Sequence, residues 1–200
     1  FSGKDDGSCD LTMVDTQTQL YYTAIFHENL KLVNQFEMEA IWGANPDDGT
    51  SGYGDVGADG VSVKVKNTYA DFNLGPVNFK IGVQPYTLSR GFMFDDDFAG
   101  AVVTYNAESF EIPFFWVKAY EGGIGDGAND YDIDYYGIAP KFNIGESGSI
   151  QPYLLYAVSD KAEKGLESYE FLGLGDGDLD GYDAELDAYF LGLDADLNFE

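Results

Sequence analysis

Basic residues, cysteine and histidine are scarce in this 200-residue sequence. Lysine and arginine number 10 against 36 aspartates and glutamates, which gives a formal net charge of -26 at pH 7. Because such a surface repels phosphate groups, we expect no nucleic acid among the partners. Cys9 has no second cysteine with which to form an intrachain disulfide. His27, the single histidine, falls in an expected short turn, so no Ser-His-Asp set can be built on it and we expect no enzyme.

Long apolar runs are also missing. No segment approaches the ~20 apolar residues that a membrane-spanning helix requires, which excludes a helical membrane protein. The sequence does not open with a basic stretch followed by an apolar one, so we expect any signal peptide to have been removed or to lie outside this sequence. Transmembrane β-strands stay open, because their signal is alternation.

Glycine and aromatic residues are abundant instead. The sequence has 25 Gly, 15 Tyr and 15 Phe, and aromatic residues make up 16% of it. Disordered acidic segments are poor in aromatics, whereas aromatic residues favour strands and glycine favours turns. The composition therefore predicts a folded, all-β protein.

Apolar and polar residues alternate with a period of two in about nine candidate strands, near the ~9–11 residues of a membrane strand. The clearest spans 30–42, with Leu32, Phe36, Met38, Ala40 and Trp42 on one face and Val33, Gln35, Glu37, Glu39 and Ile41 on the other. The last strand repeats the pattern, with Tyr189, Leu191, Leu193, Ala195, Leu197 and Phe199 opposite Phe190, Gly192, Asp194, Asp196 and Asn198. One candidate strand changes phase, because Val61, Val63 and Val65 share a face whereas Ala70, Phe72 and Leu74 share the opposite one. That change requires a β-bulge or a strand end that rises out of the membrane.

The connections between the strands alternate in length. Short turns are expected at 27–29, 75–78, 106–109 and 145–149, and long polar segments at 43–60, 91–99, 121–132 and 159–181. Outer-membrane barrels have short periplasmic turns and longer external loops. We therefore expect an antiparallel transmembrane β-barrel with the four turns at one end and long acidic loops at the other.

A secreted β-sandwich with one solvated face is the alternative, since its strands also alternate. Strands of soluble domains usually run ~5–6 residues, which favours the barrel. Bacterial barrels have an even number of strands. We expect residues 1–200 to form a single, partial barrel domain of a longer chain.

Two segments, 82–91 (GVQPYTLSRG) and 95–100 (DDDFAG), resemble a strand and loop of porin-like outer-membrane proteins related to the alginate-export family. Residues 60–61, 69–72 (YADF) and 118–122 (KAYEG) look similar, and the likeness covers about half of the chain. The resemblance implies a Gram-negative outer-membrane barrel of about sixteen or more strands, monomeric or homotrimeric, surrounded by lipid and lipopolysaccharide, that conducts small solutes or a polysaccharide. Polyanion exporters of that family have a strongly basic lumen. This sequence offers only Lys80, Arg90, Lys118 and Lys141 as inward cations, which argues against export of an acidic polymer.

Charged side chains on the lumen face would set the selectivity of such a pore. We expect the pore to be lined by Glu37, Glu39, Asp71, Lys80, Arg90, Lys118, Lys141, Asp194 and Asp196. The segment from Arg90 to Phe98, with its three aspartates at 95–97, would either fold inward as a constriction loop or stay exposed. Salt bridges inside a plugged barrel are the alternative to a water-filled pore. The expected function is passive or weakly selective passage of small hydrophilic solutes or ions.

The segment 175–181 (GDGDLDG) has the spacing of a calcium loop. Asp176, Asp178 and Asp180 occupy positions 1, 3 and 5, Tyr182 position 7 and Asp187 position 12. An aspartate replaces the usual glutamate at position 12, and no flanking helices are evident, so a solvated acidic loop is the alternative to calcium binding. A calcium-binding structural or adhesive surface protein is accordingly the second functional hypothesis.

Overall fold

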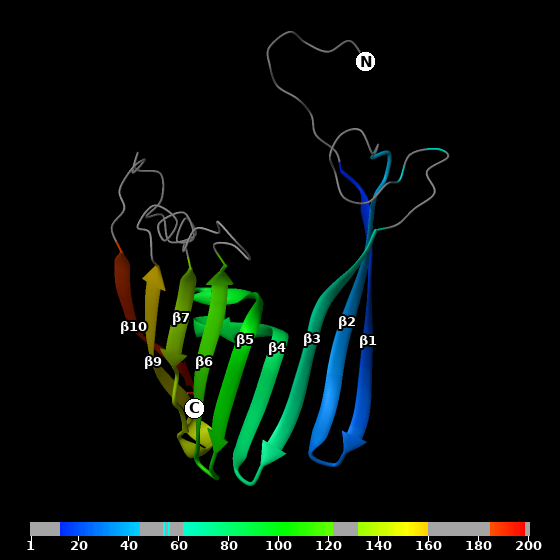
Figure 1. Cartoon of the computed structure of the whole chain (residues 1–200). Coiled ribbons are helices and arrows are strands. Elements are labelled where there is room, and N and C mark those ends of the chain that lie inside the picture. The colour runs from blue at the N-terminus through cyan, green and yellow to red at the C-terminus, as the bar shows by residue number, and fades with distance from the viewer. Residues whose placement is uncertain are drawn as a thin grey trace, which may run out of the picture. The chain divides into compact units, whose positions relative to one another are not determined.

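The computed structural model describes residues 13–44, 54, 56, 62–121, 132–159 and 185–198. These residues form ten strands and two short 3-10 helices, and Figure 1 shows their arrangement. The strands are β1 (Asp15–His27), β2 (Leu30–Ile41), β3 (Ser62–Leu74), β4 (Val77–Leu88), β5 (Phe94–Asn106), β6 (Phe110–Tyr120), β7 (Ile133–Ile138), β8 (Lys141–Asn143), β9 (Gly148–Ser159) and β10 (Leu186–Leu197). The 3-10 helices are η2 (Ser89–Gly91) and η3 (Gly145–Ser147).

The strands belong to one sheet and follow one another in chain order. The order is β1-β2-β3-β4-β5-β6-β7-β9-β10, and the short strand β8 pairs with β6 and β9. The ladders from β3 to β10 are antiparallel. The expected all-β antiparallel fold is confirmed at this level. No helix among the described residues is long and apolar enough to cross a membrane.

The chain divides into two compact units. The first unit comprises 1–22 and 34–66, and the second comprises 23–33 and 67–200. The boundary within β3 coincides with the expected change of phase: Lys64 and Lys66 pair with carboxylates of the first unit, whereas Asn67 and Asp71 are the buried side chains that follow. The polar side chains thus move from even to odd positions between Lys66 and Asn67.

The four short turns all belong to the second unit, and all four are confirmed. β1 and β2 are joined at Glu28 and Asn29, and the later turns follow β3, β5 and β8. Backbone hydrogen bonds connect neighbouring turns, from Asn73 N to Asn29 O (3.0 Å) and from Asn106 N to Pro76 O (2.9 Å). These turns define what we call the turn end of the second unit, visible at the bottom of Figure 1.

The prediction of a long loop at 91–99 is wrong. β5 begins at Phe94, and its ladder with β4 continues to the pair Leu88 and Phe94, so five residues connect the two strands. Phe98 is buried in the core and Phe94 packs against it. The apolar contacts of these two rings keep the acidic segment extended. The aspartates at 95–97 therefore lie in a strand.

Candidate functional site

The β4–β5 hairpin is bent across the sheet of the second unit, as Figure 1 shows for the ends of both strands. Its tip is η2, which contacts β10. The Arg90 side chain places Nε 3.1 Å from Asp194 Oδ1 and donates from its guanidinium to the Ala195 carbonyl oxygen at 2.7 Å. The segment from Arg90 to Phe98 is therefore the hairpin tip and the start of β5 rather than a separate loop.

Apolar packing fixes the bent hairpin. Leu88 and Met93, on either side of η2, are almost fully buried in a core that includes Phe115. The Tyr86 ring lies 5.0 Å from the Phe115 ring. The half of this face that the hairpin covers is apolar. The reason is that the hairpin replaces water as the neighbour of those side chains.

Backbone strain marks the hairpin tip. Ser89 and Arg90 have φ angles of 54° and 56°, and Gly91 follows at 85°. Non-glycine residues in this left-handed region cost roughly 1–3 kcal/mol each and persist where surrounding contacts impose them. Burial of Leu88 and Met93 and the two Arg90 contacts supply that constraint.

A polar cavity of about 300 Å³ lies between the hairpin and the turn end. Tyr86 and Thr87 of the hairpin form one side. Other lining residues come from β4, β5, β6, β8 and β9, and include Lys80, Gln84, Thr104, Glu111, Lys141 and Gln151. The uncovered half of this face is therefore hydrophilic.

Gln84 is fully buried in the wall of the cavity. Its amide nitrogen donates to the carbonyl oxygens of Lys80 (3.0 Å) and Gly100 (3.3 Å). These two acceptors fix the orientation of the amide, since the reversed amide would place three oxygens together. Its Oε1 is the buried side-chain atom without a hydrogen-bond partner in the described part of the chain.

We call the face of the sheet that carries this cavity the inner face. Most of the predicted pore-lining residues of the second unit lie on it. Asp71 accepts from Lys31 Nζ at 3.1 Å and from Asn78 Nδ2 at 2.8 Å. Lys80 is the register partner of Asp71 across β3 and β4, and Lys80 and Lys141 line the cavity. Arg90 and Asp194 pair with each other as described, and Asp196 lies two residues further along β10, on the face of Asp194. Their role in a pore stays a prediction.

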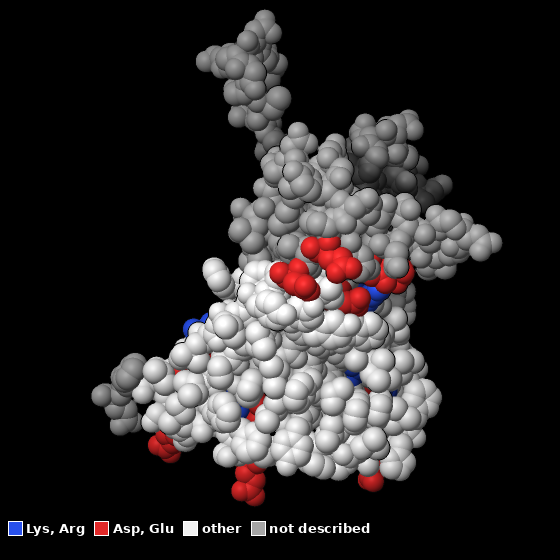
Figure 2. Space-filling view, turned by 60° about the vertical axis from the view of Figure 1, so that its left-hand side comes forward, with Lys and Arg blue, Asp and Glu red and all other residues white. Residues whose placement is uncertain are grey.

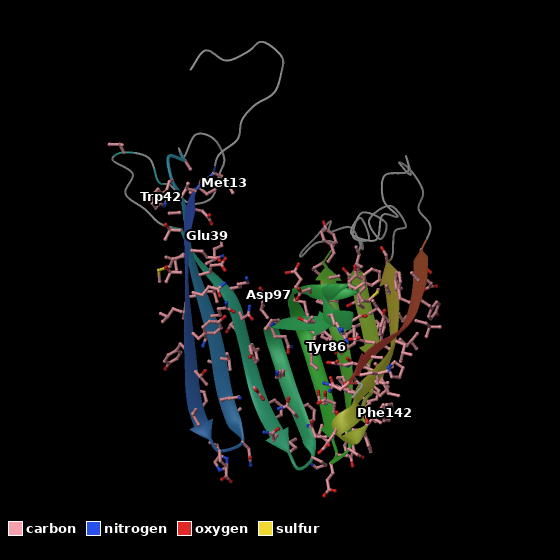
Figure 3. The ribbon with its side chains drawn as sticks, turned by 180° about the vertical axis from the view of Figure 1, so that it is seen from behind. Met13, Glu39, Trp42, Tyr86, Asp97 and Phe142 are labelled. Atoms are coloured by element: carbon pink, nitrogen blue, oxygen red, sulfur yellow. The ribbon has the colours of Figure 1, made fainter. Side chains whose placement is uncertain are left out.

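The first unit brings Glu37 and Glu39 into a ladder of polar side chains. Lys64 Nζ lies 2.7 Å from Glu39 Oε2, and Lys66 Nζ lies 3.5 Å from Glu37 Oε2. Gln19 donates to Glu37 at 2.9 Å. Figure 3 labels Glu39 of β2 and Trp42, which directly follows β2 and whose indole donates to Thr16 at 2.8 Å. Sequence reasoning missed both lysines, although their alternation with Val63 and Val65 was the available signal.

Lys118 has a different position from the one expected. It lies opposite Ala99 and Asp134 in the register of β5, β6 and β7, alternating with the buried Val117. Its ammonium contacts Asp132 at 2.6 Å and Asp134 at 3.4 Å. Lys118 thus lies on the face opposite the cavity.

That opposite face, the outward face of the second unit, is ordered into three lateral rows across six strands. The apolar row is Phe79, Val103, Phe114, Ile138, Leu154 and Leu191. The next row toward the loops, the aromatic row, is Ile81, Ala101, Trp116, Tyr136, Tyr156 and Tyr189. The charged row follows, with Val83, Ala99, Lys118, Asp134, Val158 and Asp187.

The aromatic row is held together by ring contacts. Tyr156 stacks on Tyr189 with ring centres 4.8 Å apart and lies 6.3 Å from Tyr136. Trp116 donates from its indole to Asp134 in the charged row at 2.7 Å. The aromatic row therefore lies between the apolar row and the charged row, and Trp116 and Tyr156 donate hydrogen bonds to carboxylates of the charged row. In Figure 2 the face turned forward is largely free of charged residues between acidic groups near its upper border and others at its lower edge.

The calcium motif falls mostly outside the described residues, where Asp176, Asp178, Asp180 and Tyr182 lie. Asp187, its expected last ligand, is in β10 and accepts a hydrogen bond from the Tyr156 hydroxyl at 2.5 Å. Within the residues that the structure describes, no three His, Cys, Asp or Glu side chains come together so as to hold a metal ion.

No protein-family model matches the chain, and none of the curated proteins matches it.

Proposed function

We propose that this chain is part of a transmembrane β-barrel of the bacterial outer membrane that lets small hydrophilic solutes or ions pass with weak selectivity. The resemblance to porin-like proteins related to the alginate-export family belongs to the same proposal. Lipid and lipopolysaccharide surround the outward face, and the polar half of the inner face is exposed to water.

The order of the three outward rows is the observation that carries the proposal. Large apolar side chains such as Phe114 and Leu191 are exposed rather than packed. Exposed apolar patches of this extent mark interaction surfaces. Outer-membrane barrels carry an apolar band flanked by aromatic residues at the interface. The apolar, aromatic and charged rows follow this sequence toward the loops. A β-sandwich would bury one such face against a second sheet.

The bent hairpin supports passage with a constriction. It crosses the inner face and covers its apolar half, while the half near the turn end keeps charged and amide side chains around a cavity. Acidic and basic residues are neighbours there, since Glu111 lies opposite Lys141 and Asp71 lies opposite Lys80. Mixed charge of this kind favours weak selectivity between ions.

The test is ion conductance of the intact purified protein in planar lipid bilayers. We expect discrete conductance steps with a current proportional to voltage. A Leu154→Lys variant, altered in the apolar row, should insert less often, whereas Val158→Lys, altered in the charged row of the same strand and face, should insert like the parent protein. Absence of conductance from protein that is shown to be folded in vesicles would contradict the channel, and failure to enter vesicles would contradict the membrane barrel.

A further inference from the structure

We propose that the cavity between the β4–β5 hairpin and the turn end binds a small organic anion that carries one carboxylate and one hydroxyl group, a hydroxy acid. This deepens the proposed channel function and depends on it only for the route by which the anion arrives. Binding itself is a property of the second unit, where all the lining residues lie.

The basic residues provide the first argument. Five described basic side chains have carboxylate partners, namely Lys31, Lys64, Lys66, Arg90 and Lys118. In the same described part of the chain, the ammonium groups of Lys80 and Lys141 have no ion pair, and both residues line this cavity. In a chain with 36 acidic and 10 basic residues, two unpaired lysines at one cavity are unexpected. They provide two donors for a carboxylate.

The buried amide provides the second argument. Gln84 Oε1 lacks a donor, and its orientation is fixed by the carbonyl groups of Lys80 and Gly100. An unsatisfied buried acceptor costs about 1–3 kcal/mol. A hydroxyl group of a bound molecule would remove this cost. The unpaired oxygen thus indicates a ligand that donates a hydrogen bond as well as accepting from lysine.

The charges around the cavity indicate that the ligand carries one carboxylate. Glu111 also lines the cavity and lies opposite Lys141 in the register of β6 and β8. Two ammonium groups and one carboxylate leave a single positive charge, which a monocarboxylate neutralises. An amino acid would bring no net charge and leave that positive charge uncompensated, although its ammonium group could also reach Gln84. The volume of about 300 Å³ is at the lower end of the range for ligand sites, which fits a small molecule.

Three probes of nearly equal size separate these features: lactate, its amino counterpart alanine and its deoxy counterpart propionate. Isothermal titration calorimetry on the intact, detergent-solubilised protein measures binding without any conductance. We expect lactate to bind more tightly than either of the other two. Lys80→Met and Lys141→Gln should each weaken lactate binding by roughly tenfold or more, because a charge-assisted hydrogen bond is lost.

The matched control is Lys118→Gln, which also removes one positive charge but lies on the opposite face; it should bind lactate like the parent protein. Gln84→Leu should reduce the preference for lactate over propionate without abolishing propionate binding. Folded protein that binds no lactate would overturn the proposal, as would equal weakening by Lys118→Gln. Equal affinity for lactate and propionate, or tighter binding of alanine, would overturn the hydroxy-acid assignment. These outcomes are independent of conductance, so either proposal can fail alone.

Discussion

Arg90 Nε lies 3.1 Å from Asp194 Oδ1, and this pair joins the tip of the β4–β5 hairpin to β10. Strands β6, β7 and β9 separate β5 from β10 in the sheet order. The contact therefore requires the hairpin to reach across the inner face of three strands. The apolar side chains on either side of the tip, Leu88 and Met93, are buried along this path.

Removal of the carboxylate partner should loosen the hairpin tip. Arg90 is 62% exposed and is bonded both to Asp194 and to the Ala195 carbonyl oxygen, so Asp194→Ala removes one of two contacts. Ion pairs this exposed contribute little to stability. We therefore expect trypsin to cleave the Asp194→Ala variant after Arg90 only about two- to fivefold faster than the parent protein. Asp196→Ala, on the same face of β10, is the control and should leave the rate unchanged. Equal cleavage of parent and Asp194→Ala protein would show that apolar packing alone holds the tip.

The bent hairpin could not be predicted from local sequence. The three consecutive aspartates at 95–97 were expected in a long loop that would either fold inward or stay exposed. The structure keeps them in β5 because Phe94 and Phe98 take part in apolar packing with residues distant in sequence, such as Phe115. Alternation does identify the strands and their faces, whereas the partner that covers a face depends on tertiary contacts.

The strained backbone at Ser89 makes a second prediction. Because φ is 54° there, a β-branched side chain is disfavoured, whereas asparagine tolerates the left-handed region. Ser89→Val should lower the free energy of unfolding by about 1–3 kcal/mol, and Ser89→Asn should change it by less than about 0.5 kcal/mol. Denaturant unfolding in detergent micelles, followed by tryptophan fluorescence, measures both. A valine variant as stable as the parent protein would show that the tip relaxes freely.

Gly137 accommodates the ring of Phe115 across β6 and β7, and this pair gives a third prediction. A Cβ atom at Gly137 would overlap the Phe115 ring, which supplies its three nearest atoms. Gly137→Ala should therefore destabilise the protein by about 1–3 kcal/mol through overpacking.

A double-mutant cycle tests whether the ring is the cause. Phe115→Leu should remove the overlap between the new alanine and the ring. The double variant should then lose less free energy of unfolding than the sum of the two single losses, by about 1 kcal/mol or more. Phe98→Leu, altered in another core ring, should combine additively with Gly137→Ala. Additive losses with both leucine variants would show that the alanine acts through the backbone instead.

The candidate site was predicted in part. Lys80 and Lys141 were among the expected inward cations, and both line the cavity. Lys118 was assigned by charge to the same face, but its position in β6 alternates with the buried Val117. Gln84 could not have been singled out, because its unpaired oxygen results from the close approach of two backbone carbonyls.

The depth profile of the outward face gives the last prediction. Leu154 and Val158 both lie in β9 on the outward face, in the apolar row and the charged row respectively. Four residues of a strand separate them by about 13 Å. A lysine at the middle of the lipid layer costs roughly 2–4 kcal/mol, and near the interface the cost falls to about 0–1 kcal/mol. At Val158 the lysine would also lie between the register partners Asp134 and Asp187.

Leu154→Lys should therefore reduce the fraction of protein that folds into lipid vesicles, while Val158→Lys should leave it close to that of the parent protein. Protease protection and gel mobility of unheated samples measure this fraction. If both variants folded like the parent protein, the apolar row would not face lipid. If both lost the same fraction of folded protein, β9 would not tolerate lysine at either depth.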